Sequence, residues 1–423
     1  MSSDIIITVL VLVFVVVSFI LEKIPLALTA VIGIVVLIVT GVLTPAQGFS
    51  GFVNGSVVLF FGMFIVGGAL ATTGAASQIG RFVTKFAKTE RQTIVLLMIA
   101  AGSVSTFVAN TAVAAIFIPI VFAIAKESKI PRSVLFMPMA FATSMAGGMT
   151  LVSTPPNLIV HSVLYEATGS GFNFFDFAVV TIPRAILGIL FFAFIGYKRL
   201  PRITKYDDID ESKYQAVDYS HIPNWKRTAS VVLLLATTAA IVLSEQIGVP
   251  VHVASSIGAV LAVLLRLMTE KEAYKAVDWP TIFLFAGTLA LAAAVDTSGA
   301  GALFATQFIS LLGADPRPIV LLIGLIVLTA ILTQFMSNTA TAAVLSPVVL
   351  AIALRMGIDP RSALMAIAIG STLSYASPIA TPPNTMVYSI GGYKFTDYVK
   401  NGLPVIGIVF IISIVLLPIF FPF

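Results

Sequence analysis

Long apolar runs separated by short polar gaps cover the chain from end to end. Ten runs are long enough for a helix to cross the roughly 30 Å hydrocarbon core of a bilayer, which takes about 20 apolar residues. The first run, Ile5 to Leu21, lacks a basic leading segment and a small-residue cleavage site, so we interpret it as a retained span and not a signal peptide. The predicted spans are residues 4–21, 24–43, 56–72, 133–165, 177–197, 227–246, 249–268, 281–297, 362–391 and 403–421.

Two further apolar stretches, 92–125 and 319–354, are too long for one crossing and carry polar residues at their centres. Arms of about 14 to 17 residues pass the midplane of a bilayer but are short for a full crossing. Both stretches are therefore predicted to be re-entrant helical hairpins, with tips surrounded by protein or by a watery cavity. The tip residues are Ser105, Thr106, Asn110 and Thr111 in the first stretch, and Thr333, Gln334, Ser337, Asn338 and Thr339 in the second.

The second half of the chain repeats the first in the same order and at nearly constant separation. The matching segments are Phe60–Ala75 with Phe285–Ala300, Asn110-Thr111 with Asn338-Thr339, Pro131–Ser133 with Pro360–Ser362, and Thr154–Asn157 with Thr381–Asn384. Each copy has five spans plus one hairpin, and an odd number of spans inverts the second copy. We predict a first repeat at 1–197, a cytoplasmic linker at 198–226, and a second, inverted repeat at 227–423.

Charge and composition fix the class of protein. The chain is 58% hydrophobic and only 10% charged, which leaves no room for a sizeable soluble domain. The net charge of +5 does not indicate nucleic-acid binding, because the basic residues gather in the short gaps and act as orientation signals. They place both termini outside a cell (inner) membrane that the chain crosses many times. These basic residues include Arg81, Lys85, Lys88, Arg91, Lys126, Lys129 and Arg132.

Two Thr-Pro-Pro-Asn segments interrupt the spans 133–165 and 362–391. Paired prolines end a helix, and the new helix N-terminus beyond them carries partial positive charge that suits an anion. Neighbouring carbonyls with Ser, Thr and Asn oxygens suit sodium, so the pseudo-symmetry predicts two cation sites beside one anion site. The hairpins and residues 134–160 and 362–393 contain no Asp, Glu, Lys or Arg, which argues against a proton-driven carrier.

The duplicated Asn-Thr tip followed by Thr-Pro-Pro-Asn resembles the divalent anion:sodium symporter family of the ion transporter superfamily. The resemblance implies an elevator-type transporter, usually a homodimer, that carries a dicarboxylate, citrate or sulfate together with sodium ions. The family's Ser-Asn-Thr motif is intact at Ser337-Asn338-Thr339, whereas the first copy reads Ala109-Asn110-Thr111. The missing hydroxyl at Ala109 points to weakened sodium dependence or to anion exchange.

The resemblance also implies roles for individual residues. The substrate-binding set is Asn110, Thr111, Thr154, Pro155, Asn338, Thr339, Thr381 and Pro382. The first sodium site would use Ser105, Asn110 and Ser153, and the second Thr333, Ser337, Asn338 and Ala380. No organic cofactor is implied.

The sequence leaves other functions open. Efflux of arsenite or another inorganic ion could use the same tips, and a sodium/proton antiporter is disfavoured by the absence of carboxylates. A channel is disfavoured because two opposed hairpins fit alternating gates better than a continuous pore. An enzyme is disfavoured because three histidines and no cysteine form no catalytic cluster in the sequence.

Overall fold

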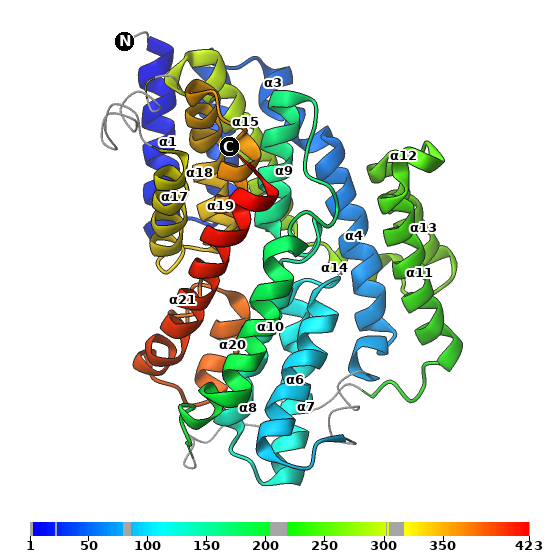
Figure 1. Cartoon of the computed structure of the whole chain (residues 1–423). Coiled ribbons are helices and arrows are strands. Elements are labelled where there is room, and N and C mark those ends of the chain that lie inside the picture. Colours follow the sequence, from blue (N-terminus) through cyan, green and yellow to red (C-terminus); the bar gives the residue numbers. More distant parts are fainter. Residues whose placement is uncertain are drawn as a thin grey trace.

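The computed structural model describes residues 3–21, 23–78, 86–203, 218–301, 303 and 317–422. Within these ranges the regular elements are helices and none is a strand (Figure 1). This confirms the predicted all-helical class. The N- and C-terminal ends lie toward the same end of the molecule.

The helices of the two halves follow the same order. In the first half they are α1 (Ser3–Leu21), α2 (Leu26–Val39), α3 (Pro45–Phe49), the 3-10 turn η1 (Ser50–Val53), α4 (Gly55–Thr72), α6 (Glu90–Ser105), α7 (Asn110–Ser128), α8 (Arg132–Ala146), α9 (Pro155–Thr168), α10 (Ala178–Phe194) and the 3-10 turn η2 (Gly196–Lys198). In the second half they are α11 (Asn224–Val242), α12 (Ser244–Ile247), α13 (Val251–Leu264), α14 (Glu270–Ala276), α15 (Trp279–Ser298), α17 (Pro318–Leu332), α18 (Asn338–Met356), α19 (Pro360–Ser371), α20 (Pro382–Ile390) and α21 (Phe395–Phe420).

Seven helical segments among the described residues are long and apolar enough to cross a membrane, and α2, α10, α13 and α17 are shorter apolar helices. The hairpin arms α7 and α18 are 19 residues each, longer than predicted, because their first turns include tip residues and both helices continue past the predicted ends at 125 and 354. The basic gap at 73–91 and the predicted linker 198–226 fall partly outside the described residues, at 79–85 and 204–217. Arg81 and Lys85 belong to that part.

Close helix packing follows the sequence repeat. A Cβ added at Gly62 of α4 would lie 2.7 Å from the Ser255 backbone of α13. At the matching Gly287 of α15, it would lie 2.6 Å from Ala30 of α2. Small residues let helix backbones approach closely where no hydrophobic effect drives association. Each half therefore packs one of its helices against the other half through an equivalent glycine.

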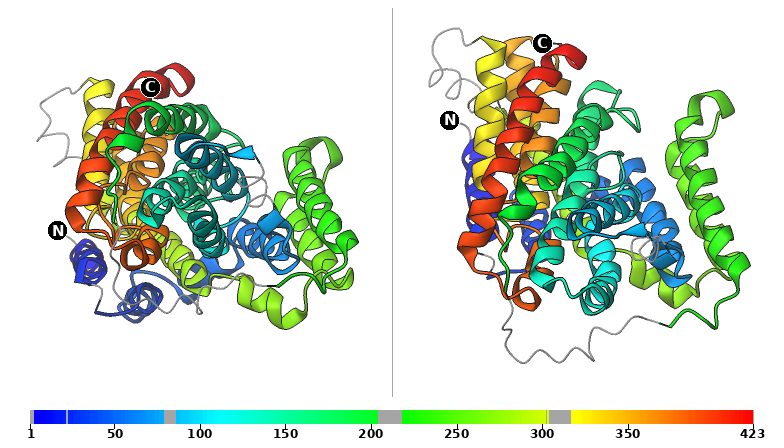
Figure 2. Two further views of the ribbon diagram at one scale, coloured as in Figure 1. Left: turned by 90° about the horizontal axis from the view of Figure 1, so that it is seen from below. Right: turned by 60° about the horizontal axis from the view of Figure 1, so that its bottom comes forward.

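The half-helices after the two breaks exchange partners. Helix α9 packs against α18 and α19 of the second half, and α20 packs against α7 and α8 of the first half. Away from this core, α11 and α13 lie together at one side of the molecule, with α17 and α21 at the opposite side (Figure 2). Every break is thus enclosed by helices from both halves.

Candidate functional site

The tip of the first hairpin gathers three oxygen atoms. Helix α6 ends at Ser105 and α7 begins at Asn110. The fully buried Ser105 hydroxyl donates to Asn110 Oδ1 at 2.8 Å and to the carbonyl of Thr143 at 2.9 Å. One hydrogen is shared between two acceptors, so the group holds more lone pairs than donors. Such an arrangement can coordinate a small cation.

The second hairpin repeats this geometry atom for atom. The Thr333 hydroxyl, also fully buried, donates to Asn338 Oδ1 at 2.9 Å and to the carbonyl of Ser371 at 2.6 Å. Ser371 ends α19, and Thr143 lies in the last turns of α8. Each cluster therefore joins a hairpin tip to the end of the helix before a break.

The two tips differ at their N-caps. Ser337 caps α18, because its hydroxyl accepts from the Ala340 amide at 3.2 Å. Ala109 occupies the same position before α7 and provides no side-chain cap. The departure seen in the sequence thus removes a hydroxyl oxygen beside the first cluster while leaving the helix start in place.

The threonines that end the two breaks have nearly identical backbone angles. Thr154 has φ −137° and ψ 143°, and Thr381 has φ −136° and ψ 144°. Each is the N-cap of the following helix, with prolines at the first two helical positions. Both threonine hydroxyls are buried and have no hydrogen-bond partner in the structure. A buried hydroxyl without a partner is costly, so these two groups are available for a ligand.

Two asparagines hold the loops before the breaks. The Asn157 side-chain amide donates to the carbonyls of Gly148 at 3.1 Å and Thr150 at 2.9 Å. Asn384 donates to the carbonyls of Ser374 at 3.0 Å and Ser377 at 3.1 Å. The asparagine of each Thr-Pro-Pro-Asn segment therefore fixes the non-helical backbone and leaves the threonine free.

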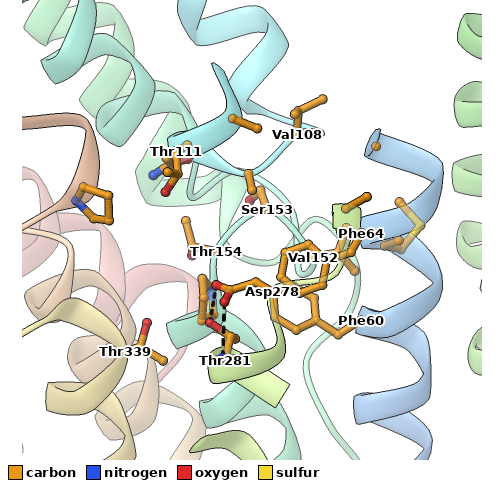
Figure 3. A pocket seen from close by; sticks show the side chains of 18 of the residues that line it. Phe60, Phe64, Val108, Thr111, Val152, Ser153, Thr154, Asp278, Thr281 and Thr339 are labelled. Atoms are coloured by element: carbon orange, nitrogen blue, oxygen red, sulfur yellow. Dashed lines mark hydrogen bonds between the residues drawn. The ribbon is translucent and has the colours of Figure 1, made fainter. Parts of the chain in front are cut away.

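One cavity of about 600 Å³ connects these elements. All eight residues of the predicted substrate-binding set line it, as do Ser153, Ser337 and Ala380 of the predicted sodium sites. Ser105 and Thr333 lie buried behind its wall. Figure 3 shows Thr111, Thr154 and Thr339, from three separate segments, around the same space as Phe60 and Phe64 of α4.

The cavity also has charged lining residues that the sequence argument missed. Glu272 and Lys275 of α14, and Asp278 at the start of α15, contribute to its wall. Asp278 caps α15 by accepting from the Thr281 backbone amide at 3.4 Å, and it also accepts from the Thr281 hydroxyl at 2.6 Å (Figure 3). The sequence does contain a signal for the start of α14. It is the capping box Thr269–Glu272, which matches the capping box Thr44–Gln47 at the start of α3 in the first half.

Comparisons with known proteins agree on one class. A family model described as citrate transporter matches residues 16–346 and again 309–423. The transporter YfbS of Escherichia coli, itself uncharacterised, is 25% identical over 96% of this chain and 98% of its own length. The sodium-dependent dicarboxylate transporter SdcS of Staphylococcus aureus is 28% identical over 91% of this chain and 80% of its own.

Two solved structures share the fold. The YdaH transporter of Alcanivorax borkumensis aligns with a TM-score of 0.64 at 17% identity, covering 88% of this chain and 86% of that one. MtrF of Neisseria gonorrhoeae, an antimetabolite efflux pump, aligns with a TM-score of 0.64 at 15% identity, covering 99% of this chain and 95% of that one. At these identities the likeness concerns the fold alone.

Proposed function

Because the chain belongs to the citrate transporter family, we propose that it is a sodium-coupled carrier of a small di- or tricarboxylate. The family and its named relatives are multi-pass membrane transporters and not enzymes. The observation that carries the proposal is the meeting of two equivalent oxygen clusters and two equivalent helix breaks around one cavity.

The breaks provide the anion site in this proposal. Helix N-termini attract negative charge, and both α9 and α20 begin at the cavity. The prolines at the first two positions of α9 and α20 carry no amide hydrogen. The N-cap hydroxyls of Thr154 and Thr381 therefore serve as the hydrogen-bond donors at the starts of these two helices. Asn110, Thr111, Asn338 and Thr339 complete the wall, with Pro155 and Pro382 setting its shape.

The oxygen clusters provide the cation sites in this proposal. In this proposal Ser105 and Asn110 of the first cluster, together with Ser153, form one cation site. Thr333 and Asn338 of the second cluster, together with Ser337 and Ala380, form the other. Their oxygens are neutral, which suits a monovalent cation better than a divalent one, because a divalent cation favours carboxylates. The absence of titratable residues in the two hairpin sequences supports sodium over protons as the coupling ion.

The equivalent elements of the two halves support an inverted-repeat elevator. In this proposal α6–α10 and α17–α21 move as one body, because their breaks interlock, against a scaffold built from α1–α4 and α11–α15. A homodimer would hold two such scaffolds in place. Site-directed cross-links between α4 and the tip of α7, formed in one transport state only, would test the movement.

Sodium-independent anion exchange is the second candidate. The observation that favours it is Ala109, which leaves the first cluster without the hydroxyl that Ser337 supplies at the second. Uptake of radiolabelled succinate or citrate into proteoliposomes, with and without an inward sodium gradient, separates the two mechanisms. Exchange predicts uptake driven by internal unlabelled substrate and unaffected by sodium.

The site assignment is tested by Asn110→Ala and Asn338→Ala in the same proteoliposomes. Each removes the amide oxygen of one cluster, so each should abolish uptake while the protein still inserts and purifies. Asn173→Ala is a matched control, because that exposed asparagine bonds Asp176 away from the cavity. Normal uptake by both cavity variants would reject the proposed site.

A further inference from the structure

A buried cation lies behind the proposed site. Arg184, in the apolar helix α10, has only 1% of its surface exposed. A guanidinium keeps its charge inside proteins, and a charge within a membrane-spanning segment is costly unless it is compensated. None of the ion pairs formed by the described residues involves Arg184. Within the described part of the chain, the groups that hydrogen-bond to its guanidinium are uncharged.

Those uncharged groups are the ends of the two helices before the breaks. At the end of α8, the carbonyl of Met145 accepts from Arg184 Nε at 3.0 Å and from Nη2 at 2.8 Å. The Ser144 carbonyl accepts from Nη2 at 3.3 Å. Across the repeat boundary, the hydroxyl of Thr372, the C-cap of α19, accepts from Nη1 at 2.7 Å. Helix C-termini carry partial negative charge, which favours a cation there.

These contacts place Arg184 next to both oxygen clusters. Ser144 follows Thr143, whose carbonyl accepts from Ser105. Thr372 follows Ser371, whose carbonyl accepts from Thr333. One side chain therefore bonds residues adjacent to both clusters, through backbone carbonyls of α8 and through the Thr372 hydroxyl of α19.

The arginine has no counterpart in the second repeat. Arg184 follows Pro183 in α10, and the equivalent Pro404 in α21 is followed by Val405. A hydrophobic residue thus occupies the matching position in the same helix type. Gly148 makes room for the single arginine, because a Cβ there would lie 2.7 Å from Nη2. The oxygen clusters and the helix breaks therefore occur in both repeats, whereas the buried positive charge beside them occurs in one repeat only.

We infer that Arg184 is a positioning residue that ties the ends of α8 and α19 together and whose fixed charge raises anion affinity and lowers sodium affinity at the cavity. The inference rests on the proposed function. It also assigns the asymmetry between the repeats a role, since the fixed charge attracts the anion in place of a sodium ion that is held more weakly beside Ala109. The hydrogen bonds fix the geometry, and the charge sets the balance between the two ions.

The test compares Arg184→Gln, which removes the charge, with Arg184→Lys, which retains it. Succinate uptake is measured in proteoliposomes against succinate and sodium concentration. Arg184→Gln should raise the KM for succinate about tenfold and lower the sodium concentration for half-maximal rate, while Arg184→Lys should keep a sodium response close to the parent's. Arg199→Gln is the matched control, because that exposed arginine also bonds a backbone carbonyl, that of Lys400 at 2.9 Å.

A purely structural role would lower the maximal rate or the protein yield. It would leave the KM for succinate and the half-maximal sodium concentration unchanged, and that result would overturn the inference. So would a higher sodium requirement in Arg184→Gln. If Arg184→Gln does not insert into the membrane, Thr372→Val provides the test, because it removes only the hydrogen bond between Arg184 and α19. It should raise the KM for succinate two- to threefold. An unchanged KM would reject the proposal that Arg184 holds α8 and α19 together.

Failure of the proposed function has a different signature, namely no uptake of succinate or citrate by the parent protein. Melting temperature in sodium chloride against choline chloride then decides the inference by itself. Sodium should raise the melting temperature of Arg184→Gln more than that of the parent protein. An equal or smaller rise rejects the role of the charge.

Discussion

The unpartnered hydroxyls of Thr154 and Thr381 allow a prediction in which stability and transport change in opposite directions. Valine has nearly the shape of threonine but lacks the hydroxyl, so Thr154→Val and Thr381→Val preserve packing and remove one polar atom each. In the structure that atom is buried without a hydrogen bond. The substitution therefore removes a cost from the empty transporter and a donor from the loaded one.

The size of both effects follows from the burial. An unsatisfied buried hydroxyl costs about 1–3 kcal/mol, so each variant should be as stable as the parent or more stable by up to that amount. A hydrogen bond to a charged ligand contributes about 1.5–3 kcal/mol. Its loss should raise the KM for a carboxylate roughly ten- to hundredfold. Most substitutions at a buried polar site reduce stability, so this combination is diagnostic.

The assay pairs uptake in proteoliposomes with melting temperature in detergent. Thr288→Val is the matched control, because this buried threonine of α15 donates to its own helix at the Leu284 carbonyl, at 2.9 Å. It should leave the KM unchanged. A parent-like KM in both Thr154→Val and Thr381→Val, or a loss of stability in both, would refute the assignment of these hydroxyls to the substrate.

Three further predictions follow from the site. Ala109→Ser should cap α7, adding about 1 kcal/mol of stability, and lower the half-saturating sodium concentration; unchanged sodium dependence would contradict this. Gly147→Ala should abolish uptake because its Cβ would overlap Asn110 Oδ1, whereas Gly324→Ala, with open space around it, should not. Hydrogen bonds from the Thr269 backbone amide and hydroxyl lower the pKa of Glu272. The parent protein should therefore melt at a higher temperature than Glu272→Gln near neutral pH, and this difference should shrink as pH falls below about 4. A difference that does not change with pH would contradict the prediction.

The sequence predicted the helices of this fold well, because apolar runs of membrane length leave few alternatives. The helix boundaries were less accurate where packing decides them. Helix α21 begins at Phe395, eight residues before the predicted span, because Asp397 accepts from the Lys394 amide and extends the helix start. Helix α14 was missed, since seven residues are too few to show a period. Inverted topology, elevator movement and dimer formation stay predictions.

The candidate site was predictable because it is built twice. Motifs duplicated in order identified both tips and both breaks, and all eight predicted substrate residues line one cavity. Arg184 and Asp278 escaped because neither has a charged counterpart in the other repeat. A comparison between the repeats detects only residues that both repeats contain, so it misses functional residues that occur in one repeat alone.

The exchange of partners between the halves has a consequence for biosynthesis. When the ribosome has released α9, the helices that enclose it, which begin at Asn338 and Pro360, have not yet been translated. Until then the first break has only part of its protein surroundings and exposes backbone groups that lipid cannot satisfy. A nascent chain that stops before α18 should therefore be recognised by quality-control proteases. Two halves synthesised as separate polypeptides should persist only when both are made together.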